Sequence, residues 1–467
     1  MAARQHRPPQ CRASVWCSLT AAALLSGCAA VPSEQTAAAP APTVWPAEAA
    51  PAARACPTGL PEGVRCLGGR DSAGAYYLIA LPAAWSGVLV LHAHGGPELG
   101  TPKAERPAQD LQRWQVTLKA GHAWAGSGFR QGGVAVRAAA EDTERLRRIF
   151  VAHVAQPKRT LLHGQSWGAG VAAVGAEMFA TSANGRSPYD AVLLSSGILA
   201  GGSQSYYFRL DLRVIYQHLC NNHPQPDEAA YPLWLGLPAG SMLTREQLAA
   251  RVEDCLGLKK PAVQRSAAQQ RKLDTLLRVI GVPERSLQGH LNWATWHFQD
   301  IVQHRTGGLS PFGNCGVRYS GSDDDEALNR AVARYTADPQ AVARFAADTD
   351  PGGRIPVPVL TVHGVGDPTA MVEYQHSFRR TMVAAGTANH LVQAFTAHDE
   401  HSYLSDATYG TLFSALLDWL DKGQAPTPAS INQACPAHET KFGKGCQFLP
   451  DYQPAPLQSR VPLRLRP

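Results

Sequence analysis

The chain lacks the features that would suit it to bind nucleic acid. Its 467 residues carry a formal net charge of only +6, and no basic patch is interleaved with aromatic side chains. The sequence has no internal repeat, and none of its cysteine spacings matches a zinc knuckle. Nucleic-acid binding, a repeat architecture and a structural zinc site are therefore unsupported. The composition, 45% hydrophobic and 17% charged, is that of a globular protein with a sizeable core.

The first residues have the pattern of an export signal. Arg4, Arg7 and Arg12 precede a short apolar segment at residues 15–25, and no acidic residue precedes Cys28. Without these three arginines the formal charge falls from +6 to +3. The apolar segment is shorter than the roughly 20 residues that a membrane-spanning helix needs. We therefore interpret it as part of a signal peptide.

The end of that signal resembles the lipobox of bacterial lipoproteins. It reads Leu25-Ser26-Gly27-Cys28, so residues 1–27 would be removed and Cys28 would be acylated. An ordinary secretory signal cut nearby is the alternative. Because Ala29 follows the cysteine, the resemblance implies an outer-membrane lipoprotein whose only membrane contact is the lipid anchor. Residues 28–55 are rich in Ala and Pro and are predicted to form a tether.

Export would place the remaining cysteines in an oxidising compartment, where disulfides are expected. Closeness in the sequence favours two short bridges, and a third could close within the middle of the chain, which would leave Cys315 free. Connectivity cannot be deduced from sequence alone, so these pairs are hypotheses. The candidate pairs are Cys56 with Cys66, Cys220 with Cys255, and Cys435 with Cys446.

From residue 75 onward, apolar runs alternate with segments of helical character. This alternation predicts an α/β fold with a mostly parallel sheet and helices on both faces. The expected strands are residues 76–81, 88–92, 123–129, 161–162, 191–196, 357–363 and 391–395. The expected helices outside the middle region are one through Trp114, residues 136–153, the segment after Ser166, and one near 409–420.

The alternation stops in the middle of the chain, where helical patterns occur without strands. We predict a helical cap over residues 199–353, inserted between two parts of the core at 56–198 and 354–425. The expected cap helices are residues 245–256, 268–280, 287–304 and 326–337. The Pro-rich tail, 426–467, is expected to wrap the surface.

One short motif sits where the predicted strand at Leu161-Leu162 meets a helix. It reads Gly164-Gln165-Ser166-Trp167-Gly168, a Gly-x-Ser-x-Gly pattern. In a strand–turn–helix setting this pattern holds a serine in a strained conformation, with its hydroxyl exposed above the strand ends. Ser166 is therefore a candidate nucleophile, although a plain serine at a helix start would look similar.

A serine hydroxyl needs a base to take its proton, and the base needs an acid to orient it. Asp367 follows the expected strand at 357–363 and is the preferred acid, with Glu373 in reserve. His401 follows the last expected strand and precedes the final helix, which makes it the preferred base, and His398 is the alternative. Together they give the chain order Ser, acid, His.

A glycine-rich turn provides candidate donors for an oxyanion hole. His94-Gly95-Gly96-Pro97 follows the strand at 88–92, so the backbone N–H of Gly95 or Gly96 could act together with that of Trp167. His398 and His401 could instead bind a metal with the acidic residues between them. Their spacing is not helical and nothing else converges on them, so no metal is predicted.

These four elements, in this order over roughly residues 70–425, resemble the α/β-hydrolase superfamily. The resemblance implies an acyl-enzyme on Ser166 with an Asp367–His401 pair, no cofactor, and a small-molecule carboxylic ester as substrate. The turn also resembles that of proline iminopeptidase-like peptidases, which usually read HGGPG, but Glu98 stands here in place of the last glycine. A serine aminopeptidase is therefore the alternative, and it would need an acidic site in the cap, from Asp227 or Glu228.

Histidines recur every seven residues in the predicted cap. His290, His297 and His304 advance about 10.5 Å per repeat along a helix, so they cannot share one metal. With Trp293 and Trp296 they would form either a face packed on the core or an aromatic wall of the substrate pocket. Residues 323–325 are three aspartates, which are interpreted as a helix start rather than a calcium site.

Overall fold

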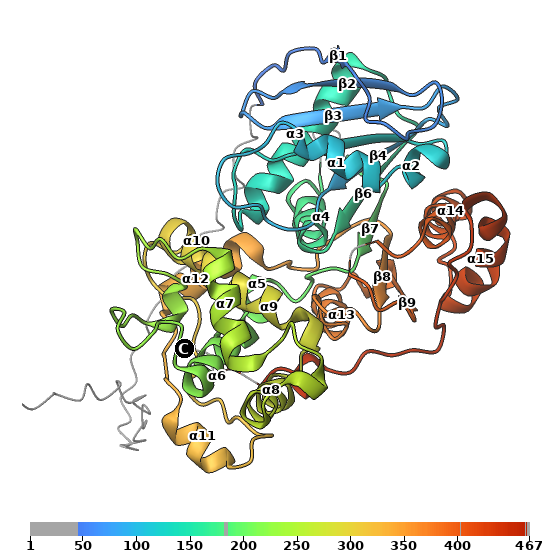
Figure 1. The fold of residues 1–467 in the computed structure, drawn as a ribbon. Coiled ribbons are helices and arrows are strands. Elements are labelled where there is room, and N and C mark those ends of the chain that lie inside the picture. Colours follow the sequence, from blue (N-terminus) through green and yellow to red (C-terminus); the bar gives the residue numbers. More distant parts are fainter. Residues whose placement is uncertain (1–44, 182–184, 402, 463, 465–467) are drawn as a thin grey trace, which may run out of the picture.

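The structure is a computed structural model that describes residues 45–181, 185–401, 403–462 and 464 (Figure 1). The predicted signal peptide, Cys28 and the first part of the predicted tether lie outside these residues. Within the described part, no helix is both long and apolar enough to cross a membrane.

The described strands form one sheet in the order β1-β2-β3-β5-β4-β6-β7-β8-β9. The strands are β1 Ala52–Arg54, β2 Arg65–Arg70, β3 Tyr76–Leu81, β4 Val88–Ala93, β5 Ala123–Ser127, β6 Arg159–Gln165, β7 Ala191–Ser195, β8 Val359–Gly364 and β9 Leu391–Thr396. From β5 to β9 every neighbouring pair is parallel, whereas β1, β2 and β3 pair antiparallel at one edge. The mostly parallel sheet is confirmed, and β1 and β2 add a hairpin that the sequence did not predict.

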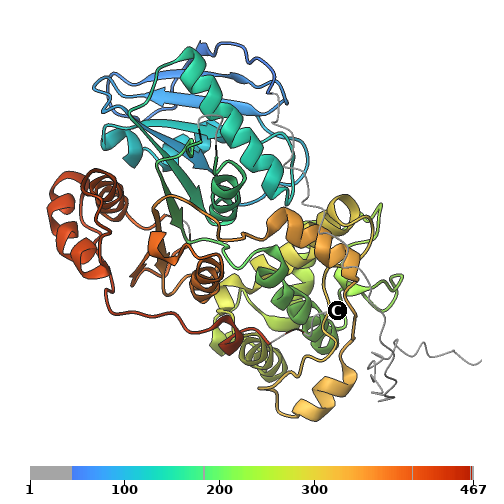
Figure 2. The ribbon, with the colours of Figure 1, turned by 180° about the vertical axis from the view of Figure 1, so that it is seen from behind.

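Successive residues of the central strands face opposite sides of the sheet. In β4, Leu89 and Leu91 pack with the helices of one face, and Val88 and Val90 pack with those of the other. Figures 1 and 2 show the two helical layers from opposite sides. The helices outside the region between β7 and β8 are α1 Arg106–Arg113, α2 Val116–Lys119, α3 Val136–His153, α4 Trp167–Met178, α13 Tyr374–Ala384, α14 Asp406–Lys422 and α15 Pro428–Phe442, with a 3-10 turn at Ala388–His390.

Between β7 and β8 the described chain has helices and turns but no strand, as the sequence predicted. These elements gather at the lower end of the molecule in Figure 1. They are α5 Gly202–Ser205, α6 Tyr207–Cys220, α7 Arg245–Leu256, α8 Ala267–Ile280, α9 Glu284–Asn292, α10 Phe298–Asp300, α11 Asp325–Ala331 and α12 Pro339–Thr349, with 3-10 turns at Leu233–Leu235 and Ala262–Gln264. The expected helix at 287–304 contains two π-helical segments, Trp293–His297 and Ile301–Arg305, and the one at 326–337 ends at Ala331.

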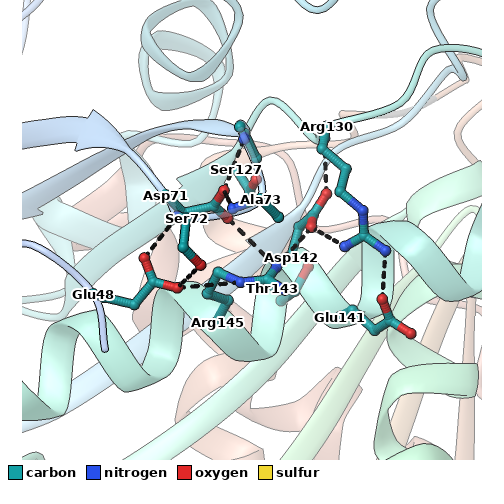
Figure 3. Close-up of polar contacts among 12 residues, drawn as sticks. Glu48, Asp71, Ser72, Ala73, Ser127, Arg130, Glu141, Asp142, Thr143 and Arg145 are labelled. Carbon is teal, nitrogen blue, oxygen red and sulfur yellow. Dashed lines mark hydrogen bonds and ion pairs between the residues drawn. The ribbon is translucent and has the colours of Figure 1, made fainter. Parts of the chain in front are cut away.

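The end of the predicted tether belongs to the folded core. Glu48 accepts hydrogen bonds from Ser72 and pairs with Arg145 of α3 at 3.2 Å, inside a chain of charged groups that reaches Asp142 and Arg130 (Figure 3). A tether over all of 28–55 is therefore wrong from residue 45 onward, because these polar contacts and the pairing of β1 fix that segment.

The C-terminal segment is more ordered than a surface wrap of prolines. It contains α15, and Thr427 caps that helix with its side chain. Beyond α15 the chain runs from the sheet to the helices between β7 and β8, as both ribbon views show. There Arg460 pairs with Glu373 at 3.0 Å and Leu457 is buried in the hydrophobic cluster of that region. The tail therefore connects the core with the cap.

All three candidate disulfides are present. They join Cys56 to Cys66, Cys220 to Cys255, and Cys435 to Cys446. In the full-length chain, before any removal of the predicted signal, Cys315 is disulfide-bonded as well, so the expectation that it stays a free thiol is wrong for that chain.

Candidate active site

Ser166 occupies the sharp turn between β6 and α4. Its φ of 56° and ψ of −121° are strained for a residue with a side chain. The flanking glycines are required by space: a Cβ on Gly164 would lie 2.2 Å from the carbonyl oxygen of Gly168, and one on Gly168 would lie 2.1 Å from that of Ala93. This is the local reason why strand and helix can meet so closely around the serine.

The serine, the preferred histidine and the preferred aspartate meet in one hydrogen-bonded line. His401 Nε2 lies 2.8 Å from Ser166 Oγ, and His401 Nδ1 lies 2.7 Å from Asp367 Oδ2 and 3.0 Å from Oδ1. With Nδ1–H donating to the carboxylate, the neutral imidazole presents an unprotonated Nε2 to the serine hydroxyl. That arrangement lets His401 accept the serine proton.

Asp367 is held as a carboxylate by its surroundings. Its Oδ1 accepts backbone hydrogen bonds from Thr369 at 2.8 Å and Ala370 at 2.9 Å. Burial by itself would raise the pKa of Asp367, but hydrogen bonds from His363 and His401 outweigh it and hold the pKa below its ordinary value. The carboxylate therefore stays charged at neutral pH and can stabilise an imidazolium at His401.

A second histidine behind Asp367 was not singled out from the sequence. His363 Nε2, at the end of β8, lies 3.4 Å from Asp367 Oδ2 and 3.0 Å from the carbonyl of Ala370. Its Nδ1 faces the amide nitrogen of Gln375 at 3.0 Å, and Gln375 is in turn bonded to Gln393. This row of buried side chains holds Asp367 on the side away from His401. No sequence pattern predicts it, because its residues come from three separate elements.

The glycine-rich turn after β4 is held by hydrogen bonds from a side chain of α1. Arg106 donates to the carbonyl of Gly95 at 2.9 Å and pairs with Glu98 at 2.7 Å. Glu98, which replaces the last glycine of the HGGPG pattern, therefore has a clear structural role in holding Arg106 against the turn. His94 is buried and contacts the same arginine at 3.2 Å, and burial lowers the pKa of His94 to about 3. It is a neutral supporting residue.

The three candidate oxyanion donors point to no internal acceptor. Among the hydrogen bonds of the described residues, none is made by the backbone N–H of Gly95, Gly96 or Trp167. Trp167 is buried, and a buried backbone N–H is seldom left without a partner, whereas Gly95 is half-buried and Gly96 is exposed. Their position beside Ser166 is what a site for a developing negative charge requires.

The cap histidines hold the cap on the two catalytic turns. His290 Nε2 lies 3.2 Å from the carbonyl of Pro368, next to Asp367, and His297 Nε2 lies 3.0 Å from the carbonyl of Pro97 in the glycine-rich turn. Trp293 stacks on His297 with ring centroids 4.8 Å apart. Trp293 also lines the cavity beside His401. This face of the cap therefore packs on the core and also forms part of an aromatic cavity wall. His304 is exposed and takes no part.

A cavity of about 470 Å³ opens beside His401. The cap contributes its wall through α6, α9 and the first π-helical segment, and the core contributes the turns that follow β8 and β9. Its lining residues include Arg209, His290, Trp293, Pro368, Asp399 and Glu400.

Several alternatives lie away from this point. His398 is buried, and its imidazole forms no hydrogen bond with Ser166; its backbone carbonyl accepts from the N–H of Gly366. Glu373 pairs with Arg460. Glu228 pairs with Arg251 and does not line the cavity. A second Ser–His contact, His163 with Ser195 at 3.2 Å, is fully buried and does not face a ligand. Among the described residues, no group of three or more His, Cys, Asp or Glu could hold a metal ion.

The chain has the α/β-hydrolase fold. Its sheet is parallel except for the antiparallel strands at one edge. A strained serine follows β6, and the acid and the histidine follow β8 and β9. No family model and no curated protein matches the sequence. Solved structures that it resembles include feruloyl esterase B from Aspergillus oryzae, 13% identical with a TM-score of 0.40 over 81% of this chain and 87% of that one.

Two further similar structures have comparable values. A hormone-sensitive lipase from a metagenome library is 12% identical, with a TM-score of 0.35 over 82% of this chain and 88% of that one. The esterase LipA from Xanthomonas oryzae is 12% identical, with a TM-score of 0.36 over 77% of this chain and 89% of that one. Likeness at this level says nothing about the activity or substrate of this chain.

Proposed function

We propose that this protein is a serine hydrolase that cleaves a carboxylic ester through an acyl-enzyme on Ser166. The observation that carries the proposal is the line Ser166 Oγ, His401 Nε2, His401 Nδ1 and Asp367, with separations of 2.8 Å and 2.7 Å. The strained backbone of Ser166 supports it, because strain of this kind persists where function requires it.

In the first half of the reaction, Ser166 Oγ attacks the carbonyl carbon while His401 Nε2 takes the hydroxyl proton. The carbonyl oxygen becomes an oxyanion that accepts from the N–H groups of Trp167 and of Gly95 or Gly96. When the tetrahedral intermediate collapses, His401 returns the proton to the leaving alcohol. Water then attacks the acyl-enzyme with the same base, which releases the acid and restores Ser166.

Charge in the cavity favours an ester over an N-terminal amino acid as substrate. An aminopeptidase would need a carboxylate to hold the substrate ammonium, but Glu228 is engaged with Arg251 outside the cavity. Asp399 and Glu400 line the cavity, but both are exposed, and Asp399 is paired with Arg285 at 3.0 Å. The buried charge of the cavity wall is the cation Arg209.

The test compares hydrolysis of a 4-nitrophenyl acyl ester series with that of an aminoacyl anilide panel that includes proline. We expect ester turnover that Ser166→Ala abolishes, while a fluorophosphonate labels the wild type only. Anilide turnover at comparable efficiency would move the protein to the peptidases. Full esterase activity in Ser166→Ala would contradict the mechanism.

We further propose that Cys28 carries a lipid anchor and that the protein is an exported, outer-membrane lipoprotein. The support is the lipobox-like Leu25-Ser26-Gly27-Cys28. Metabolic labelling with a palmitate analogue should mark the wild type, and Cys28→Ser should prevent the labelling. Labelling that survives in Cys28→Ser would exclude this anchor.

A further inference from the structure

A buried arginine in the wall of the catalytic cavity has no anionic partner. Arg209, on α6, is only 3% exposed, and it forms no ion pair with any described residue. A buried charge is costly unless it is paired or fully hydrogen-bonded. Neither the described core nor the described cap supplies an anion that would compensate the burial of this guanidinium.

The unsatisfied part of Arg209 is one edge of its guanidinium. Nη1 donates to the carbonyl of Ser205 at 3.1 Å, whereas Nε is buried with no partner and Nη2 forms no hydrogen bond within the described part of the chain. Nε and Nη2 are the two donors that bind the two oxygens of a carboxylate side by side. This edge belongs to a residue that lines the same cavity as His401.

Aromatic rings surround the guanidinium, and burial lowers the pKa of Arg209 from its ordinary value. Its central carbon lies 4.5 Å from the ring centroid of Trp293, 4.6 Å from that of Phe208 and 5.2 Å from that of Tyr206. Burial raises the pKa of Tyr206, and also that of nearby Tyr374, so neither phenol is a counter-ion at neutral pH. The rings orient the donors without satisfying them.

Another buried arginine, Arg213, also has an Nε without a partner, but its remaining donors and its position differ. Arg213, one turn further along α6, also lacks a carboxylate partner, but it donates to Thr295 at 2.9 Å and to surrounding carbonyl oxygens, and it does not line the cavity. The other charges of the cavity are Arg285, Asp399 and Glu400, which are exposed, and Arg285 already holds Asp399. Among the described residues that line the cavity, Arg209 is the one buried cation.

We propose that Arg209 binds a free carboxylate of the substrate, so that the ester cleaved at Ser166 is one that carries such a group. This proposal rests on the proposed ester hydrolysis and names its substrate class. The substrate carboxylate accepts from the Nε and Nη2 edge, and its ester carbonyl reaches Ser166 past His401 and Trp293. The binding energy of the charged end then positions the ester bond for attack.

The experiment uses a chain that begins after Cys28 and two matched pairs of esters. Mono-(4-nitrophenyl) suberate is compared with 4-nitrophenyl octanoate, and the butyrate ester of 6-hydroxyhexanoic acid with hexyl butyrate. The readout is the ratio of kcat/KM for the anionic ester to that for its neutral partner. We expect a ratio of about 10 to 100 in at least one pair, as a charge-assisted hydrogen-bonded pair provides.

Three variants locate the effect. Arg209→Met, which fills a similar volume without charge, should reduce the ratio to about one, mainly through KM. Arg209→Lys keeps the charge without the planar fork and should give an intermediate ratio, which also covers the case in which the methionine variant does not fold. Arg271→Gln removes an exposed positive charge of α8 outside the cavity and should keep the wild-type ratio.

Failure of this proposal can be told apart from failure of the ester mechanism. Turnover of the neutral esters with no preference for either anionic ester, or a preference that Arg209→Met retains, overturns the role of Arg209 alone. Absence of all ester turnover overturns the proposed function. In that case calorimetry of suberate binding to Ser166→Ala, with and without Arg209→Met, still decides whether Arg209 binds a carboxylate.

Discussion

Acid should destabilise this protein through buried histidines that the folded chain holds in neutral form, three of them around the site. Burial lowers the pKa of His94, His163 and His290 to about 3 and that of His297 to about 4. In the unfolded chain each titrates near 6.5. Between these values the unfolded state binds more protons than the folded state, so the free energy of unfolding falls as the pH drops.

The size of the effect follows from these values. From pH 6.5 to pH 5.0 each histidine lowers the free energy of unfolding by roughly 1 to 2 kcal/mol, which sums to about 6 kcal/mol for the four. Asp110 and Asp142 act in the opposite sense, because burial raises the pKa of each to about 6, and together they return about 2 kcal/mol. For these six groups the net loss of about 4 kcal/mol is large beside the 5–15 kcal/mol typical of folded proteins.

Urea unfolding followed by tryptophan fluorescence at pH 6.5 and pH 5.0 measures this loss. His297→Gln is the matched control, since its amide can still donate to the carbonyl of Pro97 but does not titrate. We expect this variant to lose roughly 1 to 2 kcal/mol less than the wild type over the same interval. An unfolding free energy that is unchanged or higher at pH 5.0 would refute the assignment of these histidines as neutral.

Three further predictions concern the site and its frame. Asp367→Asn should lower kcat by about 10⁴-fold in ester assays with little change in KM, because His401 loses the partner that fixes its tautomer. Glu98→Gln should lower kcat about tenfold by loosening Arg106 from the oxyanion turn, and a return to wild-type kcat in Glu98→Asp would show that the charge is what matters. Replacing both Cys220 and Cys255 by Ser should lower the free energy of unfolding by about 4 kcal/mol, since the bridge closes 35 residues, and calorimetry would measure it.

The sequence predicted those parts of the molecule whose signals are local. The glycines around Ser166 and the apolar runs of the neighbouring strands are patterns of adjacent residues, so they can be recognised in the sequence. The hairpin of β1 and β2 was missed because Ala52–Arg54 is embedded in Ala/Pro-rich sequence and Arg65–Arg70 contains two glycines. In α15, Pro428 and Pro436 concealed a helix that its cap and the nearby disulfide stabilise.

The missed parts of the site depend on contacts between distant segments. His363 supports Asp367 only because β8 ends beside the turn that follows it, and Gln375 completes the row from α13. Arg209 lies in α6 near the buried charged residues Asp211 and Arg213, which hide the apolar periodicity of that helix. Its burial, its aromatic surroundings and its missing counter-ion are properties of the folded chain.

The most direct measurement is the mass of the intact protein during turnover. A chain that begins after Cys28 is mixed with 4-nitrophenyl butyrate, quenched in acid within seconds, and analysed by mass spectrometry with peptide mapping. The proposed mechanism predicts one butyryl group on Ser166 in the wild type and none in Ser166→Ala. Rapid hydrolysis of the ester with the acyl group on another residue, or with equal rates in both proteins, would contradict it.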